Sequence, residues 1–379
     1  MRFLFLLILH FTFLIFHFSI ANAIEVGGHL TEDTTWSPDN NPYLVTEILY
    51  VDVGVTLAIL PGTEVKVSGA SCTSWQEFDQ NFWLYGGVSI AKFIQVDGKI
   101  IAEGTEQDSI IFTRMQDDPN YNWGTIYITE DAELCKFKYC KVEHSCAIGI
   151  AISYISKGLA FFNGKGIIRN CDFINNSVGV SSSSFLKEIE IINNSFIINN
   201  NINPFLLSLW KNHIVSYRIN IDSPDLLVCN NNFTGYNSYR TVISRQLSFA
   251  YNTISNCSET NGNGYYYDNS FNNCYYGIRA HYEEYSLFIK KNRFIGGYEG
   301  ININHAYVEI SDNYFEGCKV NITGSDENSF FVRNFITDAS NNALSGIIRV
   351  ISDNVIKNSV IGLSGCGNEL FSNNVLIDN

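Results

Sequence analysis

The 379-residue chain is 46% hydrophobic and 14% aromatic, and only 16% of its residues are charged. This composition is typical of a folded chain with a sizeable core. The formal net charge is −14, and no basic stripe is present to neutralise phosphate, which argues against nucleic acid as a partner. The same acidity argues against adhesion to anionic membrane surfaces.

Residues 1–23 have the pattern of a secretory signal peptide. Arg2 supplies a short basic region, the run from Phe3 to Phe18 is almost entirely apolar, and Ala21-Asn22-Ala23 is a small-residue cleavage site. The apolar run is short and broken, so a membrane anchor is the weaker alternative. We therefore predict export, a secreted or cell-surface location, and no membrane span after signal cleavage.

Residues 24–70 contain the first predicted strands. Apolar runs at Ile48–Val51 and Leu57–Ile59 are followed by a Pro61-Gly62 turn and by Val65–Val67. The alternation is then lost over residues 70–91, which predicts a long loop that folds its aromatic side chains back on the body. The alternative is a carbohydrate-binding platform, because aromatic faces stack on sugars. The aromatic residues of this loop are Trp75, Phe78, Phe82, Trp83 and Tyr85.

Strand alternation resumes after residue 91, is interrupted by a second predicted loop near residues 115–122, and then becomes a repeat. In the segment VEISDNYFEGC, Asn313 is preceded three residues earlier by Ile310 and followed two residues later by Phe315. Ten asparagines share these apolar neighbours, and the mean spacing between them is (374 − 194)/9 = 20 residues. They are Asn194, Asn212, Asn231, Asn252, Asn269, Asn292, Asn313, Asn334, Asn354 and Asn374.

A period near 20 with strand alternation predicts a coil in which each lap stacks on the previous one as a parallel strand, about 4.8 Å away. An asparagine at the same bend of each lap can bond both the backbone and the next asparagine, forming a ladder. We therefore predict an all-β, single-stranded parallel β-helix of about 14 laps. Its right-handedness is predicted from the general crossover preference.

In domain terms, residues 24–70 are predicted to form an N-terminal cap and the first coils, and residues 71–379 the β-helix with its two loop insertions. Trp36 and Pro38 are assigned to the cap, which would cover the first open sheet edge. The last lap lacks a polar cap, so we expect further chain or a partner to cover that edge.

Two further columns accompany the asparagines. Eight residues after them, a glycine or asparagine usually precedes an aliphatic residue, as at Gly277-Ile278 and Gly300-Ile301, and we interpret this position as a turn that needs positive φ. Five residues after them lie Cys257, Cys274 and Cys318. We favour free, buried thiols over a disulfide here. Without Cys-x-x-Cys pairs or a Cys/His pattern, we predict no metal site.

The N-terminal phrases resemble secreted right-handed parallel β-helix repeat proteins of the pectate-lyase-like superfamily. The residues that carry the resemblance are Leu57 to Thr63, Val96 to Ile100, Asp108 to Thr113, and Trp123-Gly124. The resemblance implies the stacked fold, but no single activity, because the superfamily includes lyases, hydrolases, epimerases and adhesins.

No catalytic residue is assigned. Lyase chemistry needs clustered acidic ligands for a cation, usually Ca²⁺, and a basic residue nearby, but Asp117-Asp118 is the only adjacent aspartate pair and lies in a loop. The Asp-Asp, Gly-His-Gly and Arg-Ile-Lys strings of polygalacturonase-like hydrolases are absent. We therefore predict no cofactor, with Ca²⁺ needed only if the protein is a lyase.

One outward-facing patch is predicted as a binding site. Alternation places its side chains in solvent on one parallel sheet, where they converge across adjacent laps to contact a sugar, a uronate or another extracellular protein. The alternative is an ordinary solvated face. The predicted residues are Asp222, Arg279, His281, Asn302, Asn304 and His305.

The sequence thus predicts a secreted or cell-surface β-helix protein that binds a polysaccharide, a surface glycan or another extracellular protein without catalysis. The alternative is a polysaccharide lyase, hydrolase or epimerase acting on an acidic polysaccharide, and a purely structural spacer remains as a third interpretation.

Overall fold

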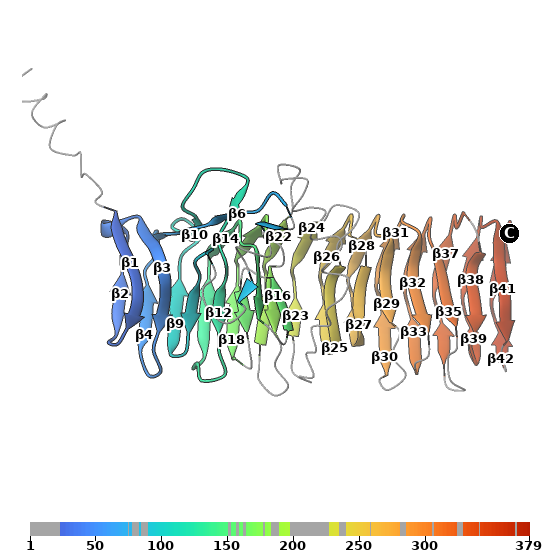
Figure 1. Ribbon diagram of the computed structural model, residues 1–379. Coiled ribbons are helices and arrows are strands. Elements are labelled where there is room, and N and C mark those ends of the chain that lie inside the picture. Colours follow the sequence, from blue (N-terminus) through green and yellow to red (C-terminus); the bar gives the residue numbers. More distant parts are fainter. Residues whose placement is uncertain are drawn as a thin grey trace, which may run out of the picture.

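The computed structural model shows a long stack of strands in which the N-terminal laps lie at one end and the C-terminal laps at the other (Figure 1). It describes residues 23–74, 76–77, 83–84, 90–150, 153–156, 159–161, 164–176, 179–182, 189–197, 227–234, 240–257, 259–280, 286–304, 307–323, 329–340, 342–367 and 370–379. Within these residues, no helix is both long enough and apolar enough to cross a bilayer.

Two large parallel sheets contain most of the strands. The first consists of β1 (Ile24–Leu30), β3 (Tyr43–Val51), β5 (Glu64–Val67), β8 (Ile94–Val96), β10 (Ile110–Arg114), β12 (Ile126–Ile128), β14 (Cys140–Glu143), β17 (Leu159–Phe161), β19 (Asp172–Ile174), β20 (Val180–Ser182), β22 (Ser195–Ile197), β24 (Asn232–Thr234), β26 (Thr253–Ser255), β28 (Ser270–Asn272), β31 (Arg293–Ile295), β34 (Tyr314–Glu316), β37 (Phe335–Thr337), β40 (Val355–Lys357) and β43 (Val375–Ile377).

The second sheet consists of β2 (Thr34–Trp36), β4 (Thr56–Ile59), β9 (Lys99–Glu103), β13 (Cys135–Lys138), β18 (Gly166–Arg169), β21 (Ile189–Ile192), β23 (Leu227–Cys229), β25 (Arg240–Ala250), β27 (Glu259–Tyr267), β29 (Tyr276–Ala280), β30 (Leu287–Lys290), β32 (Glu299–Asn304), β33 (Val308–Ser311), β35 (Lys319–Thr323), β36 (Phe330–Val332), β38 (Asn342–Ile347), β39 (Val350–Ser352), β41 (Ile361–Gly367) and β42 (Leu370–Ser372).

The described laps from β27 onward contribute strands to three faces, which separate where one long strand pairs with two neighbours. β27 pairs with β29 through its first half and with β30 through its second half, and the two resulting ribbons then continue separately. We call the ribbon β30-β33-β36-β39-β42 face two and the ribbon β29-β32-β35-β38-β41 face three. Face one is β28-β31-β34-β37-β40-β43. All these pairings are parallel, so the chain forms a parallel β-helix.

Several short elements lie outside the two large sheets in the N-terminal half. η1 (Pro38–Asn40) follows β2, and β6 (Ala70–Ser71) pairs antiparallel with β11 (Tyr121–Asn122). β15 (Ala147–Ile150) pairs with both β7 (Trp83–Leu84) and β16 (Ser153–Ser156). The predicted loop at 70–91 therefore contributes two short strands. Trp75, Phe78, Phe82 and Tyr85 lie outside the described residues, so the carbohydrate platform stays a prediction.

The first lap is built from β1 and β2, which pair with β3 and β4. Trp36 is in β2, is almost fully buried, and stacks on Tyr43 with ring centroids 4.6 Å apart. This residue thus packs as part of the first lap.

The core is a set of apolar columns that run along the axis. Ile278, Ile301 and Val320 are fully buried on face three, and Ile289 and Ile310 are fully buried on face two. The Phe271, Phe294 and Phe315 rings stack with successive centroids 4.7 and 4.8 Å apart, which matches the lap spacing. Alternation of inward and outward residues therefore holds on these laps.

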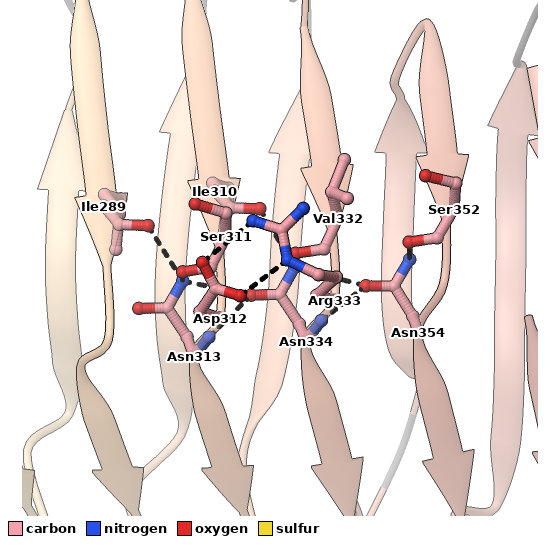
Figure 2. Close-up of polar contacts among 10 residues, drawn as sticks. All are labelled: Ile289, Ile310, Ser311, Asp312, Asn313, Val332, Arg333, Asn334, Ser352 and Asn354. Carbon is pink, nitrogen blue, oxygen red and sulfur yellow. Dashed lines mark hydrogen bonds and ion pairs between the residues drawn. The ribbon is translucent and has the colours of Figure 1, made fainter.

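The asparagines at the bend between faces two and one form a hydrogen-bonded column. Nδ2 of Asn313 donates to Oδ1 of Asn334 at 3.0 Å, and Nδ2 of Asn334 donates to Oδ1 of Asn354 at 3.2 Å (Figure 2). Each amide also bonds backbone groups of neighbouring laps, as Asn313 does with the carbonyl of Ile289 at 2.8 Å. These bonds satisfy buried polar groups that would otherwise be costly.

The prediction that Asn212 lies between Asn194 and Asn231 in the column is wrong. Nδ2 of Asn194 donates directly to Oδ1 of Asn231 at 3.1 Å, and Phe196 pairs with Phe233, so the register leaves no place for Asn212 between them. Asn212 itself lies outside the described residues. In a chain rich in asparagine and isoleucine, local spacing alone does not identify which asparagine follows Asn194 in the column.

The interpretation of the glycine column is also wrong. Gly277 and Gly300 have ordinary φ, and positive φ occurs instead at the residue just before each column asparagine, including Asp312 and Arg333. A Cβ on Gly277 would lie 2.7 Å from the Phe294 ring. Glycine is needed at this position because stacked phenylalanine rings occupy the space of a side chain.

Candidate binding face

The outer surface of face three carries a row of polar side chains, one from each of five consecutive laps. Backbone pairing places them directly opposite one another along the axis. All are partly exposed. We call this set the polar row: Arg279, Asn302, Asn321, Ser345 and Ser364.

The register of this row departs from the eight-residue repeat. Asn321 stands eight residues after Asn313, where the repeat predicts a turn, but it pairs with Asn302 on the strand, and Thr323 pairs with Asn304. The shift arises at an irregularity between Glu299 and Ile301, where one residue is bulged out of the ladder. The predicted spacing of eight residues is therefore not constant from lap to lap.

A second column lies at the beginning of the same strands. Glu259, Tyr276, Glu299 and Lys319 pair with one another on four consecutive laps. Both glutamates are almost fully buried, with 2% and 3% of their surface exposed, respectively. Buried carboxylates require compensating partners, and the neighbouring polar row supplies part of this compensation.

Arg279 compensates the first carboxylate. Its Nη1 lies 3.0 Å from Oε2 of Glu259, and its guanidinium lies over the Tyr276 ring at 5.0 Å from the centroid. The guanidinium therefore makes an ion pair and a cation–π contact together. Burial, followed by the nearby Glu299 carboxylate, raises the pKa of Tyr276, so this phenol stays protonated at neutral pH.

Glu299 has two partners. Nζ of Lys319 lies 2.7 Å from Oε1, and Nδ2 of Asn302 donates to Oε2. Lys319 also donates to the Tyr298 hydroxyl at 3.2 Å. Burial lowers the pKa of Lys319, but the hydrogen bonds to Glu299 and Tyr298 outweigh it and raise that pKa above its ordinary value. Lys319 is therefore fixed as a cation.

The network as a whole is electrically balanced. Glu259 and Glu299 supply two negative charges, and Arg279 and Lys319 supply two positive charges in direct contact with them. The four charges of this network therefore balance one another. What remains available at the surface is hydrogen-bonding capacity and aromatic area.

The aromatic area comes from the corner next to the charged network. Tyr275 and Tyr298 stack with ring centroids 5.0 Å apart and an interplanar angle of 14°. They are 50% and 48% exposed. Tyr276 packs edge-on against Tyr275, at 4.7 Å. Rings held in this way present an ordered apolar surface beside polar groups, a combination that suits sugars.

Local sequence explains why these groups meet. Glycine at 277 and 300 lets the backbone lie close to the stacked Phe294 and Phe315 rings, where a Cβ would collide. In the same region the strand register shifts between Glu259 and Thr260 and again between Glu299 and Ile301. These shifts place Glu259 and Glu299 beside the polar row.

The structure brings together some of the predicted binding residues. Arg279 and Asn302 lie opposite one another on adjacent laps, and Asn304 lies two residues further along β32. Asp222, His281 and His305 lie outside the described residues. Whether the set binds a ligand stays a prediction. In the described part of the chain, no group of three His, Cys, Asp or Glu side chains is placed to hold a metal ion.

Sequence reasoning missed Glu259, Glu299, Lys319 and the tyrosine pair. A signal was present in part, because Glu299 stands directly before Gly300 and Tyr276 directly before Gly277. The position before the glycine is thus polar or aromatic in these laps. This signal was not recognised, because simple alternation assigns the residue before the glycine to the interior and takes no account of the bulge.

The fold and this face define an elongated parallel β-helix with a polar outer row. No protein-family model matches the chain, and no curated protein matches it. Two solved structures are similar to it. A mutant of the periplasmic alginate epimerase AlgG gives a TM-score of 0.40 at 10% identity, covering 91% of this chain and 84% of that chain. PfbA, a surface adhesin of Streptococcus pneumoniae, gives 0.33 at 12% identity, covering 91% and 83%.

Proposed function

We propose that the protein is exported and binds a hydroxyl-rich polysaccharide or surface glycan along face three, without chemical turnover. The observation that carries the proposal is the polar row of one arginine, two asparagines and two serines in register over five laps. Sugar hydroxyls both donate and accept hydrogen bonds; the asparagines and serines of this row can do both, and the arginine supplies donors.

The geometry favours an extended ligand. Successive members of the row are about 4.8 Å apart, because each belongs to the next parallel strand. A linear polymer that lies along the axis therefore meets an equivalent polar group at each step. Tyr275 and Tyr298 border the row at one end and can contact the apolar face of a sugar ring.

The charge balance favours hydrogen bonding over ion pairing with the ligand. Arg279 is already paired with Glu259, and Lys319 with Glu299. A carboxylated sugar would have to compete with buried glutamates for these cations, and separating such a pair leaves a buried charge uncompensated. Neutral sugars need no such exchange.

A second candidate is a polysaccharide lyase, hydrolase or epimerase. It is favoured by one observation, the two carboxylates at Glu259 and Glu299 on either side of Tyr276. Each carboxylate is engaged by a cation and almost fully buried, which leaves little access for a substrate. For this reason binding without turnover is the function we propose.

A glycan-array screen followed by a product assay tests the proposal. Tyr298→Ala removes an exposed ring that stacks on a neighbouring ring, and we expect about tenfold weaker binding to the selected glycan. Ser345→Phe blocks the row at its fourth lap and should weaken binding of long oligomers more than that of short ones.

The matched control is Tyr265→Ala. Tyr265 is 57% exposed and stacks on Phe288 with centroids 4.7 Å apart, but it belongs to face two. Its removal should leave glycan affinity unchanged. Equal losses in the Tyr298 and Tyr265 variants, or no loss in either, would exclude face three as the binding surface. Shortened or unsaturated products would instead establish the catalytic candidate.

A further inference from the structure

Most described cysteines share one environment, in which the thiol donates to a main-chain carbonyl. Examples are Cys140 to Ala102 at 3.3 Å, Cys171 to Arg169 at 3.3 Å and Cys274 to Ile254 at 3.6 Å. Cys135, Cys257 and Cys318 make the same kind of contact. These side chains behave as small buried groups that pack at the bends of the coil.

Cys72 and Cys146 contact one another through their thiols, as Cys140 and Cys171 also do on adjacent laps, but they lie far apart in the sequence and on no common column of the coil. Both side chains are fully buried. They are separated by 146 − 72 = 74 positions in the sequence. Their contact therefore joins two distant parts of the chain.

Backbone pairing independently places both cysteines beside the same short segment of the chain. The amide of Cys72 donates to the carbonyl of Asn120 at 2.9 Å, next to the antiparallel pairing of β6 with β11. Three residues further on, Trp123 bridges Ser145, and the Cys146 amide donates to the Trp123 carbonyl at 2.8 Å. The short segment from Asn120 to Trp123 thus holds both cysteines.

We propose that Cys72 and Cys146 form a disulfide bond in the exported protein. Two S–H bonds are lost and one S–S bond forms. The two electrons and two protons pass to the disulfide of a thiol–disulfide oxidoreductase or of oxidised glutathione, which is reduced to two thiols. Exported proteins meet such oxidants, whereas cytosolic proteins are kept reduced.

The lap geometry explains why this pair forms the bond and the column cysteines do not. Cys257 and Cys274 follow columns whose strands pair in register, so their Cβ atoms are separated by about the 4.8 Å lap spacing. A disulfide needs Cβ atoms about 3.5–4.5 Å apart with the bonds turned toward each other. Cys140 and Cys171 likewise stand at equivalent positions of adjacent parallel strands, whereas Cys72 and Cys146 belong to no such column.

The bond would anchor the insertions to the coil. Cys72 follows β6 at the start of the 70–91 segment, and Cys146 directly precedes β15, which pairs with β7 from that same segment. A covalent link at this point closes a long loop and restricts the unfolded chain. It therefore stabilises both the insertion and the lap from which it emerges.

Burial affects the timing of oxidation. Contact with Cys146, together with burial, raises the pKa of the Cys72 thiol, so Cys72 contains little thiolate once the reduced chain has folded. Thiolate is the attacking species in disulfide exchange. The bond therefore forms while the chain folds, before the lap closes over the two sulfur atoms.

The test is refolding of the denatured, reduced full chain in a glutathione redox buffer, followed by alkylation in denaturant and peptide mapping without reduction. We expect one linked peptide pair that contains Cys72 and Cys146, and eight alkylated cysteines out of the ten in the sequence. Thermal unfolding of the oxidised protein should occur several degrees above that of the reduced protein.

Two double variants complete the test. Cys72→Ser with Cys146→Ser should abolish the linked peptides and the thermal shift on oxidation, while the control, Cys257→Ser with Cys274→Ser, should retain both. Alkylation of all ten cysteines in refolded protein of native circular dichroism would overturn the proposal, as would a link between another pair. Peptide mapping of the unsubstituted protein decides the question even where a variant does not fold.

Discussion

Removal of one asparagine from the middle of the bend column is the sharpest test of how the coil is stabilised. The amide of Asn313 makes five hydrogen bonds. Its oxygen accepts from the backbone and side-chain nitrogens of Asn292 at 2.8 and 3.1 Å. Its nitrogen donates to the carbonyls of Ile289 and Ser311 and to Oδ1 of Asn334 at 2.8, 3.0 and 3.0 Å.

The cost of Asn313→Ala follows from which groups lose their partner. The buried backbone N–H of Asn292 loses the Oδ1 acceptor, which costs about 1–3 kcal/mol for an unsatisfied buried group. The other four bonds contribute a net amount of about 0.5–1.5 kcal/mol each at most, and their donors and acceptors keep other contacts in part. We expect a total loss of about 4 kcal/mol in the free energy of unfolding, which is a large share of the stability of a typical protein.

Asn374→Ala is the matched control, because Asn374 occupies the same column but is less buried. Its oxygen accepts from both nitrogens of Asn354, and its nitrogen donates to Ile351 and Ser372. Water can replace these partners, so the expected loss is about 1 kcal/mol.

Urea unfolding, followed by circular dichroism and by tryptophan fluorescence, measures both losses. Agreement of the two signals checks that the transition is cooperative, which is not assured in a solenoid. Equal losses for Asn313→Ala and Asn374→Ala would refute the reasoning, because they would show that burial of the amide network does not determine its contribution.

Two further predictions concern pH and packing. Burial, and secondarily the charge of Arg114, lowers the pKa of His144 from its ordinary value of 6.5 to about 4. Since the unfolded chain binds this proton first, stability should fall as pH drops from about 6.5 to 4, and His144→Asn should be the more stable protein at pH 4.5 but not at pH 7.5 in urea titrations. Gly277→Ala places a methyl group 2.5 Å from the Gly300 carbonyl oxygen and should cost about 1–3 kcal/mol by thermal unfolding. The same change at Gly362, where the nearest atom is 3.0 Å away on a side chain of the last lap, should cost less.

The coil could be predicted from sequence because its signal is repeated. One asparagine between two apolar residues is weak information, but the pattern recurs from Asn231 to Asn374 at near-constant spacing, and only a stack of laps makes such spacing useful. The prediction placed Asn212 between Asn194 and Asn231, because the spacing of the repeat carries no information on which laps are neighbours. Pairing is a long-range property, and here β22 pairs directly with β24.

The candidate site was less predictable, for a physical reason. Arg279 and Asn302 were found because alternation from Ile278 and Ile301 directs them outward. The carboxylates that bind them, Glu259 and Glu299, each precede a bulge in the strand. Across a bulge, alternation no longer specifies which face of the sheet a side chain is on. The same failure explains the interpretation of the glycines, since the space taken by stacked rings is a tertiary property that no local pattern contains.

A repetitive coil must also avoid skipping a lap, because asparagines and phenylalanines are equivalent from one lap to the next. The residues before five of the column asparagines distinguish neighbouring laps by their charge. Along the column, Asp268, Lys291, Asp312, Arg333 and Asp353 alternate in charge. Arg333 binds Asp312 through two bonds of 2.7 and 2.9 Å, as Figure 2 shows.

If the Arg333 lap were looped out, Asp312 would face Asp353, and two like charges would replace an ion pair. At an exposed turn each such pair contributes only about 0–1 kcal/mol, too little to hold the fold together. A difference between attraction and repulsion over these five laps nevertheless favours one register over its neighbours there, since the apolar columns do not discriminate between them. The buried columns therefore provide the stability of this coil, and the charged turns help to specify the order of its laps.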